Sequence, residues 1–348
     1  MASVDVTIRG AGVFGLSVAW ACVQRGARVR VVDPYGPGAG SSGGIVGALA
    51  PHVPENWNSK KAFQLDSLLM AEGFWAAVKQ ASGMDPGYGR TGRLQPVQDA
   101  AGLELARSRS SGAAQLWKGQ AIWEVVQVSD APGFEPVSPS GFLIRDTLSA
   151  RMHPRRACAA LAAALQAQGA QITDTAEDSG AVVWATGWQG LRDMTEALGG
   201  RKVGDGVKGQ AVLLAYDAGP DAPQLFVDGL HIVPHKDGTV AIGSTSEREF
   251  ADPIATDEQC QTLVDRARAG CPALQDAKVI ERWAGVRPRA RSRAPVLGHW
   301  PGRAGHFVAN GGFKIGFGMA PKIAEVMASL VLDGRDDIPE AFVLENQL

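Results

Sequence analysis

Strand-like apolar runs and stretches with a helical hydrophobic period follow one another along the 348-residue chain. At the N-terminus, a β-branched run at 4–8, a helical pattern that ends at Gly26 and a second β-branched run at 29–32 form a strand–helix–strand unit. Apolar residues with a helical period predict further helices at 59–82, 100–118, 157–168, 256–269 and 318–332. Short apolar runs predict strands at 93–97, 141–144, 171–173, 181–184, 278–288 and 307–309.

The segment from Val207 to Thr245 has a different character, because its short β runs follow one another without helices. Strands are expected there at 210–215, 225–227, 231–234 and 240–244, in a mainly antiparallel sheet. The predicted fold class is therefore α/β combined with α+β. A discontinuous Rossmann-like nucleotide-binding domain (1–56, 146–206 and 272–348) would carry an inserted, mainly antiparallel β substrate domain (57–145 and 207–271).

The first strand runs into the turn Gly10-Ala11-Gly12-Val13-Phe14-Gly15, which has the G-x-G-x-x-G spacing. In such turns the first glycine permits the tight bend, the second lets a pyrophosphate approach the backbone, and the third lets helix and strand pack closely. Asp33 ends the second strand, where a carboxylate can accept hydrogen bonds from a ribose diol. An ordinary βαβ unit would leave the three glycines and Asp33 unexplained. The turn therefore predicts a dinucleotide site. Arg9 is unusual, since that strand is normally apolar.

The loop from Pro34 to Gly44 is too rich in glycine for a helix or a strand. Small residues such as Ser41, Ser42 and Gly43 would let the backbone approach a flat ligand closely. The same composition would also suit a flexible linker. The loop follows directly after Asp33, the predicted ribose-binding acid, and this position favours a contact with the ligand.

Composition narrows the class of protein. Hydrophobic residues make up 45% and charged residues 20%, which is typical of a folded globular chain. The net charge of −2 gives no bulk attraction to nucleic acid or to an anionic membrane. Cys22, Cys158, Cys260 and Cys271 are far apart, which predicts buried thiols and neither a metal site nor a disulfide framework. With no recognisable signal peptide or membrane span, we expect a cytoplasmic location.

Several further stretches, taken with the N-terminal turn, resemble the D-amino-acid oxidase and glycine oxidase family of flavoproteins over most of the chain. They are the Gly/Ser loop 38–47, His153-Pro154-Arg155-Arg156, Val182–Gly187, Lys208-Gly209-Gln210, Ile242–Thr245, Trp283–Pro288 with Pro295 and Gly298, and Gly311–Gly316 with Ala320-Pro321. Each stretch alone is a weak match to the family. The order and spacing of all the stretches together are the strong evidence for the resemblance.

The resemblance implies FAD, bound in extended form with its ring at the domain interface. No cysteine lies near the segments from Trp283 to Gly316 and no histidine lies in the first glycine loop, so we expect the flavin to be bound non-covalently. It implies oxidation of a primary or secondary amine to an imine, which water hydrolyses, with oxygen or a quinone as the electron acceptor. The implied cofactor-binding residues follow the matching motifs. They are Gly10, Gly12, Val13, Phe14, Gly15, Asp33, Pro34, Ser41, Ser42, Gly43, Gly44, Ala185, Thr186, Gly187, Gly285, Arg287, Gly311, Gly312, Phe313, Lys314 and Ile315.

Arg287 stands where the family keeps an arginine that grips the substrate carboxylate, although the same position would suit an arginine on the protein surface. Three positions depart from the family. His231 replaces a carboxylate-contacting tyrosine, Lys314 replaces an arginine, and Gly312 replaces a histidine, which would open space near the flavin. His231 could equally be structural, and Lys314 could point to solvent. The candidate catalytic residues are therefore Arg287, Lys314 and His231.

Arginines recur at every second position from Arg287 to Arg293. If this segment is extended, all four share one face. They could form a solvated turn or a mouth that attracts a small anionic amine substrate.

Residues 43–97 also resemble the oxidase half of the enzyme that modifies the tRNA wobble uridine, through Gly47–Pro51, Asn58, Phe63 and Gly92–Gln95. This similarity allows a carboxymethylaminomethyl-type tRNA base as a second class of substrate, although the net charge makes a nucleic-acid partner unlikely. A non-catalytic FAD-binding module is disfavoured, because Arg287 and the last glycine turn would then have no reason to lie together. The flavoprotein motifs after residue 150 argue against an NAD-dependent dehydrogenase.

Overall fold

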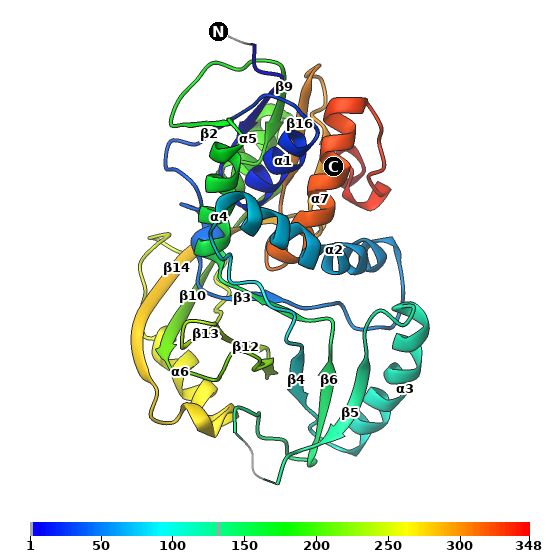
Figure 1. The fold of residues 1–348 in the computed structure, drawn as a ribbon, viewed down its shortest axis with the longest axis vertical. Helices are drawn as coiled ribbons and strands as arrows, with labels where there is room; N and C mark the ends of the chain where they lie inside the picture. Colours follow the sequence, from blue (N-terminus) through cyan, green and yellow to red (C-terminus); the bar gives the residue numbers. More distant parts are fainter. Residues whose placement is uncertain (1–2, 131–132) are drawn as a thin grey trace.

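The computed structural model describes residues 3–130 and 133–348 (Figure 1). A six-stranded sheet occupies the half of the molecule that holds both termini, with strand order β15-β16-β9-β1-β2-β8. Strands β16, β9, β1, β2 and β8 are parallel, and β15 is antiparallel to β16. The strands are β1 (Val6–Arg9), β2 (Val29–Val32), β8 (Gln171–Thr173), β9 (Ala181–Trp184), β15 (Val296–His299) and β16 (His306–Asn310).

Helices cover this parallel sheet. Helix α1 (Val13–Gln24) packs against both α4 (Pro154–Ala167) and α7 (Gly316–Asp333), which is why nine of its twelve residues are buried. Helix α5 (Gly187–Ala197) follows β9 directly. Helix α4 begins at a proline, whose missing N–H costs nothing in the first turn of a helix.

The second sheet has eight strands in the order β14-β10-β13-β12-β11-β4-β6-β5 and lies in the other half of the molecule (Figure 1). Its neighbours are antiparallel apart from the parallel pair β11 and β4. The strands are β4 (Arg93–Pro96), β5 (Trp123–Gln127), β6 (Phe142–Asp146), β10 (Gly204–Ala215), β11 (Gln224–Val227), β12 (Leu230–Pro234), β13 (Thr239–Gly243) and β14 (Lys278–Ala290).

Helix α6 (Gln259–Gly270) packs on β10, β12 and β13, and α3 (Ala100–Leu116) packs on β5. A short two-stranded sheet joins β3 (Gly47–Leu49) to β7 (Ala150–Met152). Four 3-10 helices complete the described chain, at Ser41–Gly43, Pro272–Leu274, Glu340–Phe342 and Glu345–Gln347. The predicted combination of a Rossmann-like unit with a mainly antiparallel sheet is confirmed.

Helix α2 (Ser59–Ser82) has the bounds that the periodicity predicts, with Asn58 as its N-cap and Gly83 at its end. The sequence missed α5, because Leu191 and Met194 are its only large buried side chains. It also missed β3, β5, β7 and β15. Two of these, β3 and β7, have three residues each, too few for a period of two to show.

The predicted division into two domains meets two complications in the structure. Helix α2, assigned to the substrate domain, packs against α7 and α4. Strand β14, assigned to the FAD-binding domain, pairs along its length with β10 in the eight-stranded sheet. The domain boundaries therefore stay a prediction.

All four cysteines are buried and free, as the sequence predicts. Within the described residues, no helix combines the length and the apolar character that a membrane span needs.

We expect opposite effects on stability from alanine at two helical glycines. A Cβ on Gly15 would lie 1.9 Å from the carbonyl oxygen of Gly10, so Gly15→Ala forces the βαβ turn apart. It should lower the free energy of unfolding by about 2 kcal/mol or more. Gly73 is exposed within α2 with open space beside it, so Gly73→Ala should raise stability by about 1 kcal/mol. Urea denaturation measures both, and equal effects would contradict the packing argument.

Candidate active site

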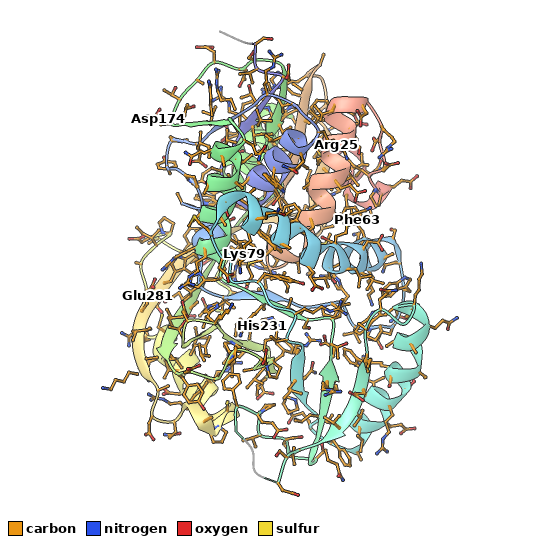
Figure 2. The ribbon with its side chains drawn as sticks, in the orientation of Figure 1. Arg25, Phe63, Lys79, Asp174, His231 and Glu281 are labelled. Carbon is orange, nitrogen blue, oxygen red and sulfur yellow. The ribbon has the colours of Figure 1, made fainter. Side chains whose placement is uncertain are left out.

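A single cavity of about 1290 Å³ extends from the turn after β1 to the eight-stranded sheet. One end is lined by the glycine turn, Asp33 and the Ser41–Ser42 segment. The other end is lined by Arg287 of β14, His231 of β12 and the segment Gly312–Lys314. His231 lies in the half of the molecule that holds the eight-stranded sheet (Figure 2). The cavity therefore spans both halves of the fold.

At the first end, glycine permits a close approach of three backbone segments. Gly10 has a φ of +107°, and a Cβ there would lie 2.4 Å from the carbonyl oxygen of Ala185. Helix α1 begins at this point with no side-chain cap on Gly12 and no acidic residue in its first turn. Ser42 Oγ accepts a hydrogen bond from the Val13 N–H at 3.0 Å. The helix N-terminus thus directs backbone N–H groups and a positive dipole end at the cavity.

Asp33 lies at the cavity wall, where the sequence predicts a ribose contact. Its two oxygens accept hydrogen bonds from the N–H groups of Ala11, at 2.7 Å, and Tyr35, at 2.9 Å. Each oxygen can accept a second hydrogen bond. Arg9 also lines this end, and its guanidinium pairs with Asp178 at 2.7 Å, which accounts for a charged residue at the end of β1.

Most of the predicted cofactor residues line this cavity. They are Gly10, Gly12, Val13, Phe14, Asp33, Pro34, Ser41, Ser42, Gly44, Ala185, Thr186, Gly187, Gly285, Arg287, Gly312, Phe313 and Lys314. Gly15, Gly43, Gly311 and Ile315 are not among the lining residues.

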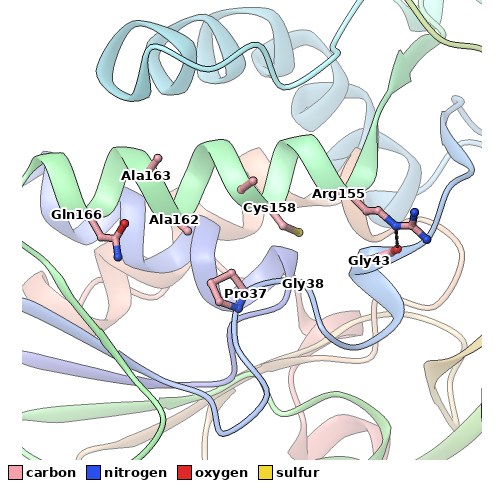
Figure 3. A pocket seen from close by; sticks show the side chains of 9 residues that line it. Pro37, Gly38, Gly43, Arg155, Cys158, Ala162, Ala163 and Gln166 are labelled. Carbon is pink, nitrogen blue, oxygen red and sulfur yellow. Dashed lines mark hydrogen bonds between the residues drawn. The ribbon is translucent and has the colours of Figure 1, made fainter. Parts of the chain in front are cut away.

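Gly43 lines a separate cavity of about 350 Å³ between the glycine-rich loop and helix α4 (Figure 3). Arg155 of α4 donates from Nε to the Gly43 carbonyl oxygen at 2.8 Å, and its guanidinium pairs with Glu281 of β14 at 2.6 Å. One side chain thus connects the loop, the helix and the long strand. This fixes the loop that forms the wall of the main cavity.

Arg287 is held by the protein at the end of the cavity that His231 and Gly312–Lys314 also line, where the sequence predicts the substrate. Its Nη2 donates to the carbonyl oxygens of Thr245, at 2.6 Å, and Lys208, at 3.2 Å, and its Nη1 donates to Ser244 Oγ at 2.5 Å. Nε is buried without a partner. Burial lowers the pKa of Arg287 to about 10, so the side chain remains charged at neutral pH.

Lys314 also lines the cavity, and its residue is exposed, so the ammonium stands at the border between the cavity and solvent. Its Nζ lies 5.8 Å from the centre of the Phe313 ring. Desolvation, followed by repulsion from Arg287, lowers its pKa. The two cations therefore face the same space.

His231 lines the cavity with its Nδ1 buried and without a partner. Burial is the main reason that its pKa falls to about 4, and the charges of Arg93 and Lys314 add to the effect. The imidazole is therefore neutral at pH 7 and can offer one donor and one acceptor.

Two expectations need correction. Gly312 does not open space, because the ring of Phe14 fills it, and a Cβ at Gly312 would lie 2.8 Å from Phe14 Cζ. The arginine run is not extended throughout, because β14 ends at Ala290. Arg291 lies beyond this end and donates to the carbonyl oxygen of Leu348 at 3.1 Å.

Several cavity residues were missed from the sequence. Trp283 packs its ring edge against Gly44 and Gly285, and Ser244 anchors Arg287. Tyr35, Trp188 and Phe226 also line the cavity. Trp283 and Ser244 lie within motifs that carry the resemblance, so the sequence could have predicted both as residues of the site. Trp188, Phe226 and Tyr35 enter the cavity only through the tertiary fold.

Comparisons with known proteins agree with this geometry. A family model described as FAD-dependent oxidoreductase matches residues 5–330, so the chain belongs to that family and FAD is its cofactor. The glycine-lined cavity and the open N-terminus of α1 fit the pyrophosphate end of such a group, and Asp33 fits a ribose.

Among individual proteins, the chain is similar to the bifunctional protein ThiO/ThiG of Synechocystis, with 28% identity over 95% of the chain and 52% of that protein. It is 27% identical to the glycine oxidase of Pseudomonas putida, over 99% of the chain and all of that enzyme. The crystal structure of glycine oxidase from Geobacillus kaustophilus superposes with a TM-score of 0.83 at 21% identity, over 98% of both chains. The chain thus spans about half the length of the bifunctional relatives. The local resemblance to the tRNA-modifying enzyme stays a prediction.

We expect Asp33→Ala to weaken FAD binding by about tenfold, because the ribose loses a charged acceptor worth about 1.5 kcal/mol or more. Wild-type protein should be yellow and release FAD, with no FMN, on denaturation. Chromatography of the released flavin and titration of the apoprotein measure both effects. Unchanged affinity in Asp33→Ala would show that the carboxylate serves only the Ala11 and Tyr35 N–H groups.

The free energy of unfolding should fall as the pH is lowered from about 6.5 toward 4. The folded protein holds His231 with a pKa of about 4, whereas the unfolded chain binds the proton near its ordinary pKa of 6.5. Between pH 6.5 and pH 4 the unfolded state therefore binds more protons than the folded state, so lowering the pH favours unfolding. At pH 5, His231 alone should contribute a loss of about 2 kcal/mol. Urea denaturation of wild type and His231→Phe at pH 7 and pH 5 tests this, and equal losses in both proteins would contradict it.

Proposed function

We propose that the protein oxidises the amine of a small amino acid, or of an N-substituted amino acid, to an imine. Water then hydrolyses the imine to a keto acid or aldehyde plus an amine. The observation that carries this proposal is the chemistry of the cavity at its substrate end. Arg287 and Lys314 supply positive charge there, whereas Asp33 and Asp174, the only acidic residues that line the cavity within the described chain, belong to its other end.

Two cations at an end of the cavity that no described carboxylate lines suit an anionic substrate group. Arg287 is preorganised by Ser244, Thr245 and Lys208, so its charge is fixed in position before the substrate arrives. Lys314 is the mobile member of the pair, since an ammonium on a flexible stem can follow the substrate. Together they would hold the carboxylate and orient the α-C–H bond, which is catalysis by proximity and orientation.

Neutral His231 would bond to the substrate without adding a third positive charge. When bound, FAD supplies the hydride acceptor. Phe226 and Phe313 line the same end and would exclude water from the reacting bond. Both oxygen and a quinone are suitable electron acceptors.

The experiment that tests this proposal is anaerobic bleaching of the flavin by glycine, sarcosine, D-amino acids and opines. At least one of these amines should reduce the flavin within the time of an enzymatic turnover. A flavin that stays oxidised with every amine would favour a binding module and overturn the proposal.

Arg287→Ala should retain FAD but lower kcat/KM by about 3 kcal/mol, or roughly 100-fold, because the substrate carboxylate loses its fixed cation. Arg287→Lys should recover only part of this loss, since an ammonium lacks the planar fork with which a guanidinium binds a carboxylate. The matched control is Arg303→Ala, which removes an exposed arginine stacked on Trp300. Near-normal kinetics in Arg287→Ala would indicate that the substrate carboxylate binds at Lys314 instead.

A further inference from the structure

Positive charge gathers around one aromatic ring at the substrate end of the cavity. The centre of the Phe313 ring lies 5.5 Å from Arg287 Cζ, 5.8 Å from Arg289 Cζ and 5.8 Å from Lys314 Nζ. Phe313 holds this position with a φ of 43°, in the left-handed region that a phenylalanine rarely adopts. Cations within about 6 Å of a ring centre are attracted to its face, but they also repel one another.

More arginines stand behind this group. Desolvation, followed by repulsion from Arg293 and Arg248, lowers the pKa of Arg289. Arg293 reaches this position because the chain turns back after β14, with a φ of 64° at Arg293 itself. Arg287 and Arg289 thus reach Phe313 from β14 itself, and the turn brings the charge of Arg293 close to Arg289.

Acidic side chains do not neutralise this cluster. Among the ion pairs of the described residues, none involves Arg287, Arg289, Arg293, Arg248 or Lys314. Asp205 stands opposite Arg289 across the strand pair, but it bonds to Arg192 and the Gly206 N–H. Glu247 acts on Arg287, but it is engaged by Gln210 and lies 3.8 Å from Lys208. The positive charge of this cluster is therefore available to an anionic ligand.

The two cavity cations also offer different numbers of donors. Arg287 has already given both N–H groups of Nη2 and one of Nη1 to the protein, so only Nε–H and one N–H of Nη1 remain. Lys314 makes no hydrogen bond or ion pair with the described residues, and its ammonium has three N–H groups. One carboxylate on Arg287 would leave Lys314 and Arg289 without a counter-charge.

We propose that the substrate carries two anionic groups, and that the second is bound beside Lys314 in the field of Arg289 across the Phe313 ring. The class of substrate is an N-substituted amino acid whose substituent ends in a carboxylate or another small anion. This inference rests on the proposed function for the identity of the amine. It concerns a binding site, however, and binding can be measured without turnover.

Three sulfur analogues, which carry no amine to oxidise, separate charge from shape. Thiodiacetate has two carboxylates, its monoamide has the same size with one carboxylate, and (methylthio)acetate has one carboxylate and no second polar group. Each is titrated into the FAD-loaded protein and followed by the visible absorbance of the flavin and by calorimetry. We expect thiodiacetate to bind about tenfold or more tightly than its monoamide, which corresponds to one well-placed charge contact.

Variants locate the second site. Lys314→Gln should reduce the preference for thiodiacetate over its monoamide to about twofold or less, and Arg289→Gln should reduce it several-fold. Arg291→Gln is the matched control, because Arg291 belongs to the same run but bonds to Leu348, and it should keep the full preference. FAD content verifies that each variant is folded. Equal binding of the two ligands by the wild type, or a full preference in Lys314→Gln, would overturn the proposal.

The same protein separates this proposal from the proposed function. Anaerobic bleaching by sarcosine and by N-(carboxymethyl)glycine is measured beside the binding series. If sarcosine bleaches the flavin while thiodiacetate binds no better than its monoamide, the second anionic site is wrong and amine oxidation stands. If thiodiacetate is preferred but no amine bleaches the flavin, the anion site stands and amine oxidation fails.

Discussion

The close packing of backbone against backbone at the β1–α1 turn is the constraint on which the rest of the site depends. Gly10 lies under the carbonyl oxygen of Ala185, and Gly15 lies against the carbonyl oxygen of Gly10. Side chains at these positions would separate β1, α1 and the end of β9. Because the three segments touch, the N-terminus of α1 opens directly into the cavity. The dinucleotide end of the site is therefore a consequence of packing as much as of hydrogen bonding.

The long strand pair β10 and β14 carries the other end of the site. Residues from Gly204 to Ala215 pair with residues from Lys278 to Ala290, with a shift of register between Leu213 and Leu214, so Arg287 lies within the unbroken part of a long ladder. The end of β14 also meets the last glycine turn, through the bridge between Arg289 and Gly312. This contact places Phe313 and Lys314 beside Arg287. A rigid strand thus holds Arg287, while Lys314 lies on the glycine turn and its ammonium keeps freedom to move.

Charge is distributed unevenly along the cavity. Asp33 and Asp174 line the dinucleotide end, and Arg287 and Lys314 line the substrate end beside a neutral His231. Like charges so close together cost folding energy, since each repels the next in a partly desolvated space. An anion bound at this end would offset that cost, which is the reason for proposing an anionic substrate there.

The sequence by itself determined most of the local elements, and it predicted the residues that line the glycine-rich end of the cavity. The glycine spacing, Asp33 and the helical period of α2 are local properties, because turn geometry and side-chain period depend on neighbours in the chain. The substrate end was decided by tertiary structure. The ring of Phe14 fills the space at Gly312, and the turn after Ala290 separates Arg291 from Arg289, as no linear pattern could specify. Contacts between residues hundreds of positions apart exist only once two sheets have packed.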